Sequence, residues 1–225
     1  IGKRFSTDAK ITYVNQDIEN RPRTGEENSP VSNIYNISRS IPTSDANRYE
    51  YLNNIGIPTP TPFPSTLSSI YQNPYWVINR TAINETRDRI IGFLNAKFKI
   101  TDWLSLSGRA NLDRTFDAGE TQVSEGTILY SKSGGDYSKS NITVTERWFD
   151  VMLEGKNAIT DKLKIEYRAG AIFQDAKYDA NFAGANGLNI TNKFSLNFAK
   201  APSVSSDFSQ VQTQGVYGQI NLSFK

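Results

Sequence analysis

The stretch IIGFLNAKFKITDWLSLSGRANLD, residues 90–113, gives the clearest indication of the fold, because apolar and polar residues alternate on both sides of a short interruption. In 90–100 the even positions are apolar or small, whereas the odd ones include an asparagine and two lysines. In 104–113 the even positions are again apolar or small, and the odd ones are polar or charged. A period of two is typical of a β-strand whose faces meet different surroundings. The stretch therefore predicts two antiparallel strands joined by a tight turn at Thr101-Asp102-Trp103.

The same alternation returns elsewhere in the chain. It is clear in 163–174 and 216–225 and weaker in 8–17 and 142–156. A second Thr-Asp pair at 160–161 predicts another tight turn, in which the aspartate carboxylate accepts hydrogen bonds from nearby backbone N–H groups. Residues 5–9 look like a third such turn. The sequence therefore predicts about six strands that run alternately up and down.

Strand length and charge favour a membrane as the surroundings of these strands. The strands span roughly 10–15 residues, against ~5–6 for an average soluble strand and ~9–11 to cross a bilayer at a tilt. In the four clear strands the apolar face carries no charge, and a charge at the bilayer midplane costs ~2–4 kcal/mol. A half-buried strand of a soluble sandwich has the same alternation but is shorter. We therefore predict an all-β fold, an antiparallel transmembrane β-barrel segment.

The connections between the strands fall into two classes. The Thr-Asp turns are short, whereas the connections 18–86, 117–141 and 179–210 are long. Short periplasmic turns and long external loops are typical of outer-membrane barrels. Six strands are too few to close a barrel, and an open edge in lipid leaves backbone groups unsatisfied. We therefore expect residues 1–225 to be part of a single, incomplete barrel domain, with the plug and the remaining strands elsewhere.

Composition excludes several kinds of chemistry. The 225 residues include 25 basic and 23 acidic ones, interspersed, and neither cysteine nor histidine. This excludes disulfides, thiolate and imidazole metal sites, cysteine nucleophiles and a Ser-His-Asp triad. No basic stripe indicates a nucleic-acid partner, and no apolar run reaches the ~18 residues of a spanning helix. We expect no catalytic, cofactor or metal site, and hence no enzyme.

One block of the chain resembles a known family. The stretch NPYWVIN at 73–79 is followed by RDRIIG at 87–92, the turn at 100–105 and Gly108-Arg109. Read together, these resemble the barrel of SusC/RagA-like TonB-dependent transporters, and GVYGQINL at 215–222 is similar to one of its later strands. The resemblance implies the outer membrane of a Gram-negative bacterium, a SusD-like surface lipoprotein as partner and TonB as the energy source. It also implies a glycan or peptide cargo, and a plug that this chain lacks.

Two groups of residues are candidates for contact with cargo or plug. The aromatics of the long loop 18–86, which also holds Phe63 and Pro64, could line a cavity, although packing of the loop itself is the interpretation we favour. Charges on the polar faces of the strands could meet cargo or plug, although we favour a salt-bridged ladder that stabilises the barrel interior. The candidates are Tyr71, Tyr75, Trp76, Arg109, Asp113 and Arg168. Aromatics expected at the membrane interface are Phe98, Trp103, Tyr167, Phe173 and Phe224.

Two other functions stay open at this point. A secreted β-rich carbohydrate-binding or adhesin module could use the aromatics of loops 18–86 and 179–210. A passive porin would need no plug. The uncharged alternate face on long strands joined by tight turns favours the importer over the secreted module, because a soluble protein has to bury such stripes.

Overall fold

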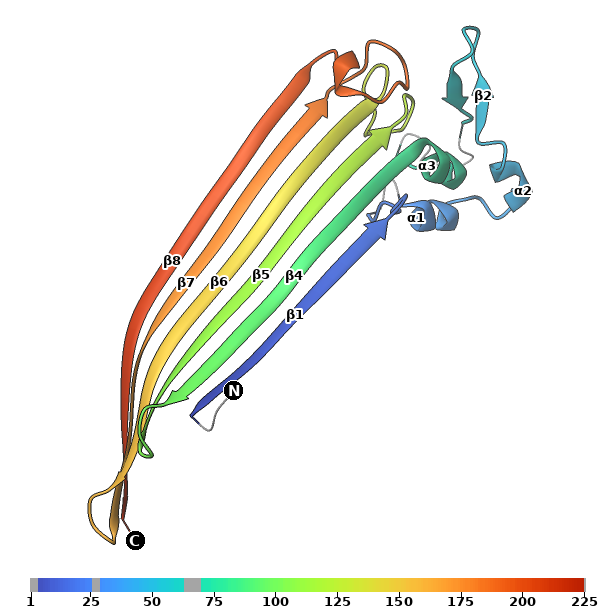
Figure 1. The fold of residues 1–225 in the computed structure, drawn as a ribbon. Helices are drawn as coiled ribbons and strands as arrows, with labels where there is room; N and C mark the ends of the chain where they lie inside the picture. The colour runs from blue at the N-terminus through green and yellow to red at the C-terminus, as the bar shows by residue number, and fades with distance from the viewer. Residues whose placement is uncertain (1–3, 26–28, 63–69, 225) are drawn as a thin grey trace.

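The chain folds into one long, curved antiparallel sheet (Figure 1), seen in a computed structural model that describes residues 4–25, 29–62 and 70–224. The sheet has six strands in the order β1-β4-β5-β6-β7-β8, so neighbours in the sheet follow one another along the chain. The strands are β1 (Phe5–Ile18), β4 (Thr81–Lys99), β5 (Leu104–Val123), β6 (Asp136–Ala158), β7 (Leu163–Ala185) and β8 (Pro202–Phe224).

The sheet is open, since β1 and β8 form its two edges and do not pair with each other. Both ends of the chain lie at the end of the sheet that carries the tight turns, and the helices gather at the opposite end (Figure 1). The predicted all-β, antiparallel, incomplete barrel segment of six strands is confirmed.

The two tight turns are built alike, and a threonine closes each of them. The Thr101 hydroxyl accepts a hydrogen bond from the Leu104 N–H at 3.0 Å. The Thr160 hydroxyl accepts one from the Leu163 N–H at the same distance. The expectation that the aspartate carboxylate would do this was wrong. The threonine hydroxyl lies three residues before the amide that it binds, which is the spacing of a short side-chain-to-backbone turn.

Two sequence-based boundaries differ from the structure. Residues 5–9 do not form a turn but begin β1, where Phe5 pairs with Phe98 and Ala9 with Leu94. Their alternation matches that of β4, which favours pairing over reversal. The strands also continue past the alternating intervals, so the long connections are 19–80, 124–135 and 186–201 rather than 18–86, 117–141 and 179–210. Toward these connections the face that is apolar near the tight turns carries polar residues, such as Asp175 and Lys177 on β7, while the pairing of backbone groups between the strands continues.

The long connections carry the small elements at one end of the sheet. Pro58 to Pro60 form one strand of a short two-stranded hairpin, and proline is tolerated there because each strand of such a hairpin is an edge strand. Phe63 and Pro64 lie outside the described residues. None of the described helices is long and apolar enough to cross a membrane. The elements are α1 (Pro30–Tyr35), α2 (Thr43–Ala46), β2 (Glu50–Leu52), β3 (Pro58–Pro60), α3 (Pro74–Arg80) and η1 (Leu196–Phe198).

The buried core of the described residues lies at this same end. Trp76 and Val77 of α3 are buried, and Tyr137, Ala185 and Leu188 form a cluster covered by the 186–201 connection. Along most of the sheet, by contrast, large apolar side chains such as Val151 and Val216 stay exposed. No described element covers either face of the sheet at those levels.

Candidate functional site

The register divides the six strands into two faces of opposite character. Strand partners share a face, so residues paired across the sheet form rows. One row runs through Ala9, Leu94, Ala110, Phe149, Phe173 and Gln214. We call the face that carries this row the apolar face, and the opposite one the ion-pair face.

The apolar face is free of charge from the row of Phe149 and Phe173 to the tight turns. On β7 this band runs from Leu163 to Phe173, which is ~33 Å along the strand and ~23 Å across a bilayer at a tilt of ~45°. The apolar belt of an outer-membrane barrel is ~25 Å tall. The band therefore has the height that lipid requires.

The ion-pair face carries a series of cation–carboxylate contacts between strands. The best-formed one joins the Arg109 guanidinium to both oxygens of Asp150, at 2.9 and 2.8 Å. The Asp150 side chain is 3% exposed, and Tyr217 reaches it with its hydroxyl at 3.4 Å. The tyrosine ring crosses β7 at Gly170, where any Cβ would lie 2.5 Å from the ring. Arg109 also stacks over the Trp148 ring, 4.8 Å from its centroid.

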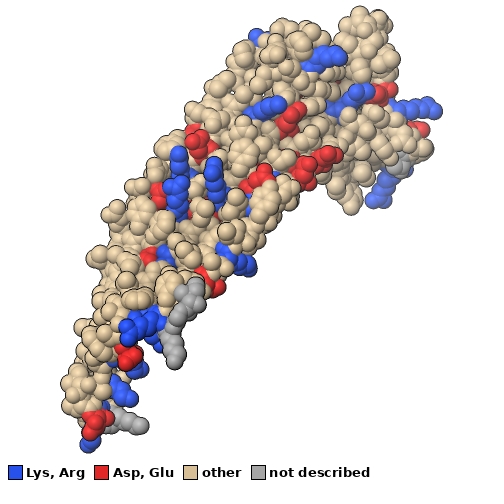
Figure 2. All heavy atoms as spheres, in the orientation of Figure 1, with Lys and Arg blue, Asp and Glu red and all other residues tan. Residues whose placement is uncertain are grey.

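The other ion pairs on this face extend the series toward both ends of the strands. Glu154 binds two cations, Lys97 at 3.6 Å and Arg168 at 3.2 Å. Arg89 binds Asp113 through two hydrogen bonds, at 2.9 and 2.5 Å. Arg87 does the same with Asp117, at 2.6 and 2.8 Å. Lys156 pairs with Glu166 near the second turn. Figure 2 shows basic and acidic side chains interspersed along the sheet.

The structure therefore gives all three charged candidates an ion-pair partner. Arg109, Asp113 and Arg168 lie on one face, each bound to a charge on another strand. This is the ladder that the sequence analysis favours. The sequence reading missed Asp150, Trp148 and Tyr217 as members. Asp150 alternates with Phe149 and Val151, a signal that could have placed it on the polar face.

The aromatic candidates of the long loop differ in exposure. Trp76 is fully buried, and its indole N–H donates to the Thr127 hydroxyl at 3.0 Å. Its ring therefore packs the loop against the 124–135 connection. Tyr75 is half-buried and stacks on Tyr49, with ring centroids 6.5 Å apart. Tyr71 is half-buried as well.

Polar contacts fix the position of α3 at the loop end. Asn73 begins the helix by accepting a hydrogen bond from the Tyr75 N–H at 2.9 Å. The Arg80 guanidinium donates two hydrogen bonds of 2.6 Å to Glu50. These bonds raise the pKa of Arg80 above its ordinary value. Gln72 joins the two connections by binding the backbone of Gly126 and Ile128. These contacts hold α3 on the end of the sheet.

The expected interface aromatics lie on the apolar face or in a turn. Phe173 packs against Phe149, with ring centroids 6.3 Å apart, at the border of the charge-free band toward the long connections. Tyr167 covers Gly155 on the neighbouring strand. The remaining ones, Phe98, Trp103 and Phe224, are exposed near the tight turns.

Within the described ranges there is no cluster of three or more acidic residues that could hold a metal ion. The carboxylates of the ladder are bound to cations across the strands. This arrangement presents one face suited to lipid and one face suited to water.

The fold is similar to that of a transport protein. The RagAB peptide importer in its closed-closed state matches with a TM-score of 0.70 at 11% identity, covering 100% of this chain and 25% of that chain. The open-open state matches with a TM-score of 0.64 at 14% identity, covering 100% and 24%. A further structure of the RagAB peptide transporter matches with a TM-score of 0.58 at 13% identity, covering 71% and 18%.

These matches concern the fold. No family model and no curated protein matches the sequence. The chain spans about a quarter of the length of the importer chains that match all of it. The expected resemblance to RagA-like transporters is confirmed at the level of the fold, which matches about a quarter of an importer chain.

Proposed function

We propose that this chain is part of the wall of a TonB-dependent importer of large nutrients in the outer membrane of a Gram-negative bacterium. One observation carries the proposal. The whole chain matches the importer fold, and its six-stranded sheet has one face with a charge-free band and an opposite face with ion pairs between strands. A transporter wall between lipid and a polar interior needs both.

The division of the two faces supports a membrane wall rather than a secreted module. A soluble sandwich covers its apolar face with a second layer. Here Val151 and Val216 are exposed on that face, and no described element packs over them. The open edges at β1 and β8 would each leave a row of backbone groups unsatisfied in lipid. Further strands of the same barrel would satisfy them.

The ion-pair face would form the inner wall of the barrel and meet the plug or the cargo. The Arg109 and Arg168 side chains are about half exposed even though each is bound to a carboxylate. Such charges could contact a plug while the ladder keeps the strands in register. Arg109, Asp113 and Arg168 are the residues we assign to this role.

The long connections would face the cell exterior and a SusD-like surface lipoprotein. Tyr75 and Tyr71 are the loop aromatics with exposed surface. A tyrosine ring offers an apolar face and a polar tip, which suits a peptide side chain or a sugar ring. The similar importer carries peptides, so peptide is the cargo class to test first and oligosaccharide the second.

Uptake by living cells tests the proposal. Cells with and without the full-length protein that carries this sequence would be given a fluorescent oligopeptide pool and, separately, a fluorescent oligosaccharide pool. We expect uptake of one pool to require the protein and to stop when an uncoupler collapses the inner-membrane proton gradient. Uptake that continues under the uncoupler would indicate a passive porin. Secretion of the protein into the medium would indicate the binding module.

A further inference from the structure

Three cations gather around one threonine on the apolar face, just beyond the charge-free band. Thr145 on β6 pairs with Arg114 on β5 and with Lys177 on β7. Arg147 lies two residues along β6 on the same face and pairs with Asp175. These three cations lie between the charge-free band and the long connections. We call Arg114, Arg147 and Lys177 the cationic cluster.

The cluster is only partly neutralised. The Arg114 side chain is exposed and makes no hydrogen bond or ion pair with any described residue. Arg147 lies 3.9 Å from Asp175, beyond hydrogen-bond distance. Asp175 instead accepts hydrogen bonds from Gln210 at 2.6 Å and Gln212 at 3.1 Å.

Its remaining contacts leave positive charge at the surface. Lys177 lies over the Phe208 ring at 5.1 Å, a contact that keeps its charge. Two further carboxylates lie on this face near the cluster. Asp88 accepts hydrogen bonds from Tyr13 and Asn15. Asp179 lies two residues beyond Lys177 along β7. The cluster therefore has cationic groups available for an anion.

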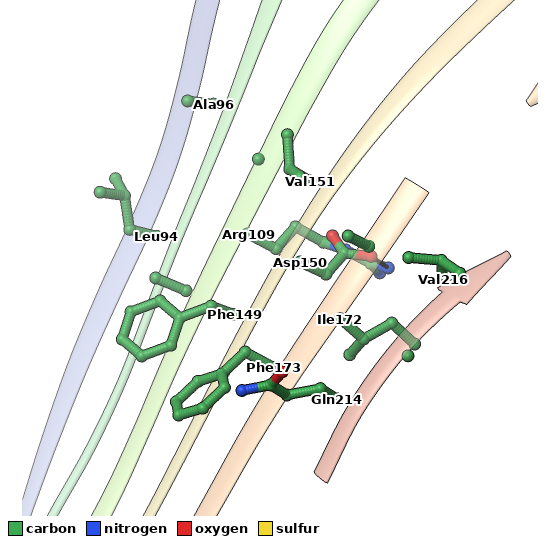
Figure 3. A pocket seen from close by; sticks show the side chains of 14 residues that line it. Leu94, Ala96, Arg109, Phe149, Asp150, Val151, Ile172, Phe173, Gln214 and Val216 are labelled. Carbon is green, nitrogen blue, oxygen red and sulfur yellow. Dashed lines mark hydrogen bonds and ion pairs between the residues drawn. The ribbon is translucent and has the colours of Figure 1, made fainter. Parts of the chain in front are cut away.

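An apolar groove lies directly on the turn side of the cluster. It has a volume of about 790 Å³ and crosses β4 to β8, within the ~300–1,000 Å³ of small-molecule sites. Small residues such as Gly108, Ala110 and Ala171 leave room, and Phe149 and Phe173 border it. Figure 3 shows these two rings and Leu94 on one side of the sheet, with the Arg109–Asp150 pair apart from them.

The groove and the cluster are adjacent. Arg147 is two residues from Phe149 on the same strand face, a separation of ~7 Å. A ligand that covers both would need an anionic head and an apolar body.

We propose that the cationic cluster and this groove together bind a phosphorylated, acylated lipid of the outer leaflet. The inference rests on the proposed function, because it takes the long connections to lie outside and the apolar face to meet lipid. Arg114, Arg147 and Lys177 would bind the phosphate by charge-assisted hydrogen bonds. An acyl chain would fill the groove between Phe149 and Phe173. The site lies at the height where the headgroup of an outer-leaflet lipid meets the apolar belt.

Native mass spectrometry of the full-length protein in detergent tests the proposal. The probes are a synthetic lipid A with one phosphate and the same glycolipid without phosphate. We expect the wild type to retain the phosphorylated form, and the double variant Arg114→Gln/Lys177→Gln to retain about tenfold less of it. Ala171→Phe, which fills the groove, should lower retention of both glycolipids.

Matched controls separate the site from general effects. Lys10→Gln/Lys99→Gln removes two cations from the ion-pair face and should leave retention unchanged. Ala169→Phe places the same ring on the same strand face, one row outside the groove, and should also leave it unchanged.

Several results would overturn the lipid site. These are equal retention of the two glycolipids, equal loss in the Lys10/Lys99 control, or displacement of lipid A from the wild type by millimolar inorganic phosphate. Cargo uptake by cells tests the proposed function independently of lipid binding. A wild type that imports cargo but retains no lipid A refutes the lipid site alone. A protein that retains lipid A but imports nothing refutes the importer alone.

Discussion

The two faces of the sheet are built from alternate residues of the same strands, yet they follow different rules. On the apolar face, Val151 and Val216 are exposed without a covering layer. On the ion-pair face, Asp150 is bound by Arg109 and reached by Tyr217 from two strands away. Both faces belong to the same strands and share the same backbone hydrogen bonds. The surroundings of each face, rather than backbone pairing, therefore determine which side chains it carries.

The largest effect is expected when the same positive charge is placed on each face in turn. Leu153→Arg puts a guanidinium in the middle of the charge-free band and should cost ~2–4 kcal/mol. Met152→Arg puts it on the ion-pair face, between the carboxylates of Asp150 and Glu154, and should cost much less. Urea unfolding of the full-length protein in lipid vesicles measures both. Equal losses would show that the two faces do not differ in surroundings.

A smaller loss of stability is expected when a methyl group is added to the glycine that lies under a tyrosine ring on each face. An added Cβ at Gly170 would lie 2.5 Å from the Tyr217 ring and 2.7 Å from the backbone oxygen of Val151. We expect Gly170→Ala to cost ~1–3 kcal/mol because backbone cannot move aside. At Gly155 the close atoms all belong to the movable end of Tyr167, so Gly155→Ala should cost less. The same unfolding measurement ranks them, and the reverse order would contradict the packing described for Gly170.

Removing one partner of the best-formed ion pair should have an effect of ~1–2 kcal/mol. Arg109→Met leaves Asp150, with its side chain 3% exposed, without its cation, and an unsatisfied buried acceptor is costly. The double variant Arg109→Met/Asp150→Asn should regain part of the loss. A double-mutant cycle measures the coupling. Additive losses would mean that the pair contributes nothing as a pair.

The smallest effect is expected at the exposed end of the same ladder. The Arg87 side chain is 52% exposed and its partner Asp117 28%. An exposed pair contributes ~0–1 kcal/mol, so Arg87→Met should change stability by no more than that. The change should also shrink at 1 M salt, where exposed pairs are screened. A loss as large as that of Arg109→Met would indicate that Arg87 is buried in the complete barrel.

The strands were predictable where the two faces have different surroundings. Residues 90–113 alternate because one face is charge-free and the other polar, and the structure pairs them as expected. The first part of β4, 81–89, has polar residues on both faces and gave no such signal. Its strand depends on pairing with 115–123 of β5, which no local pattern reveals.

The candidate site was predictable in part for the same reason. The faces of Arg109, Asp113 and Arg168 follow from alternation, and the ladder was the favoured interpretation. Their partners depend on register between strands far apart in sequence. The burial of Trp76 depends on Thr127, a contact between two connections. Such loop-to-loop packing has no periodicity from which it could be inferred.

We expect the apolar face to meet lipid and the ion-pair face to be shielded from it. Nitroxide labels at Val151→Cys and Met152→Cys, placed one at a time in the full-length protein in vesicles on a cysteine-free background, test it directly. We predict that the label at 151 is relaxed strongly by oxygen, which concentrates in lipid, and weakly by a water-soluble nickel complex. The label at 152 should be less accessible to oxygen. Equal oxygen accessibility at both positions would show that the two faces do not differ in their contact with lipid.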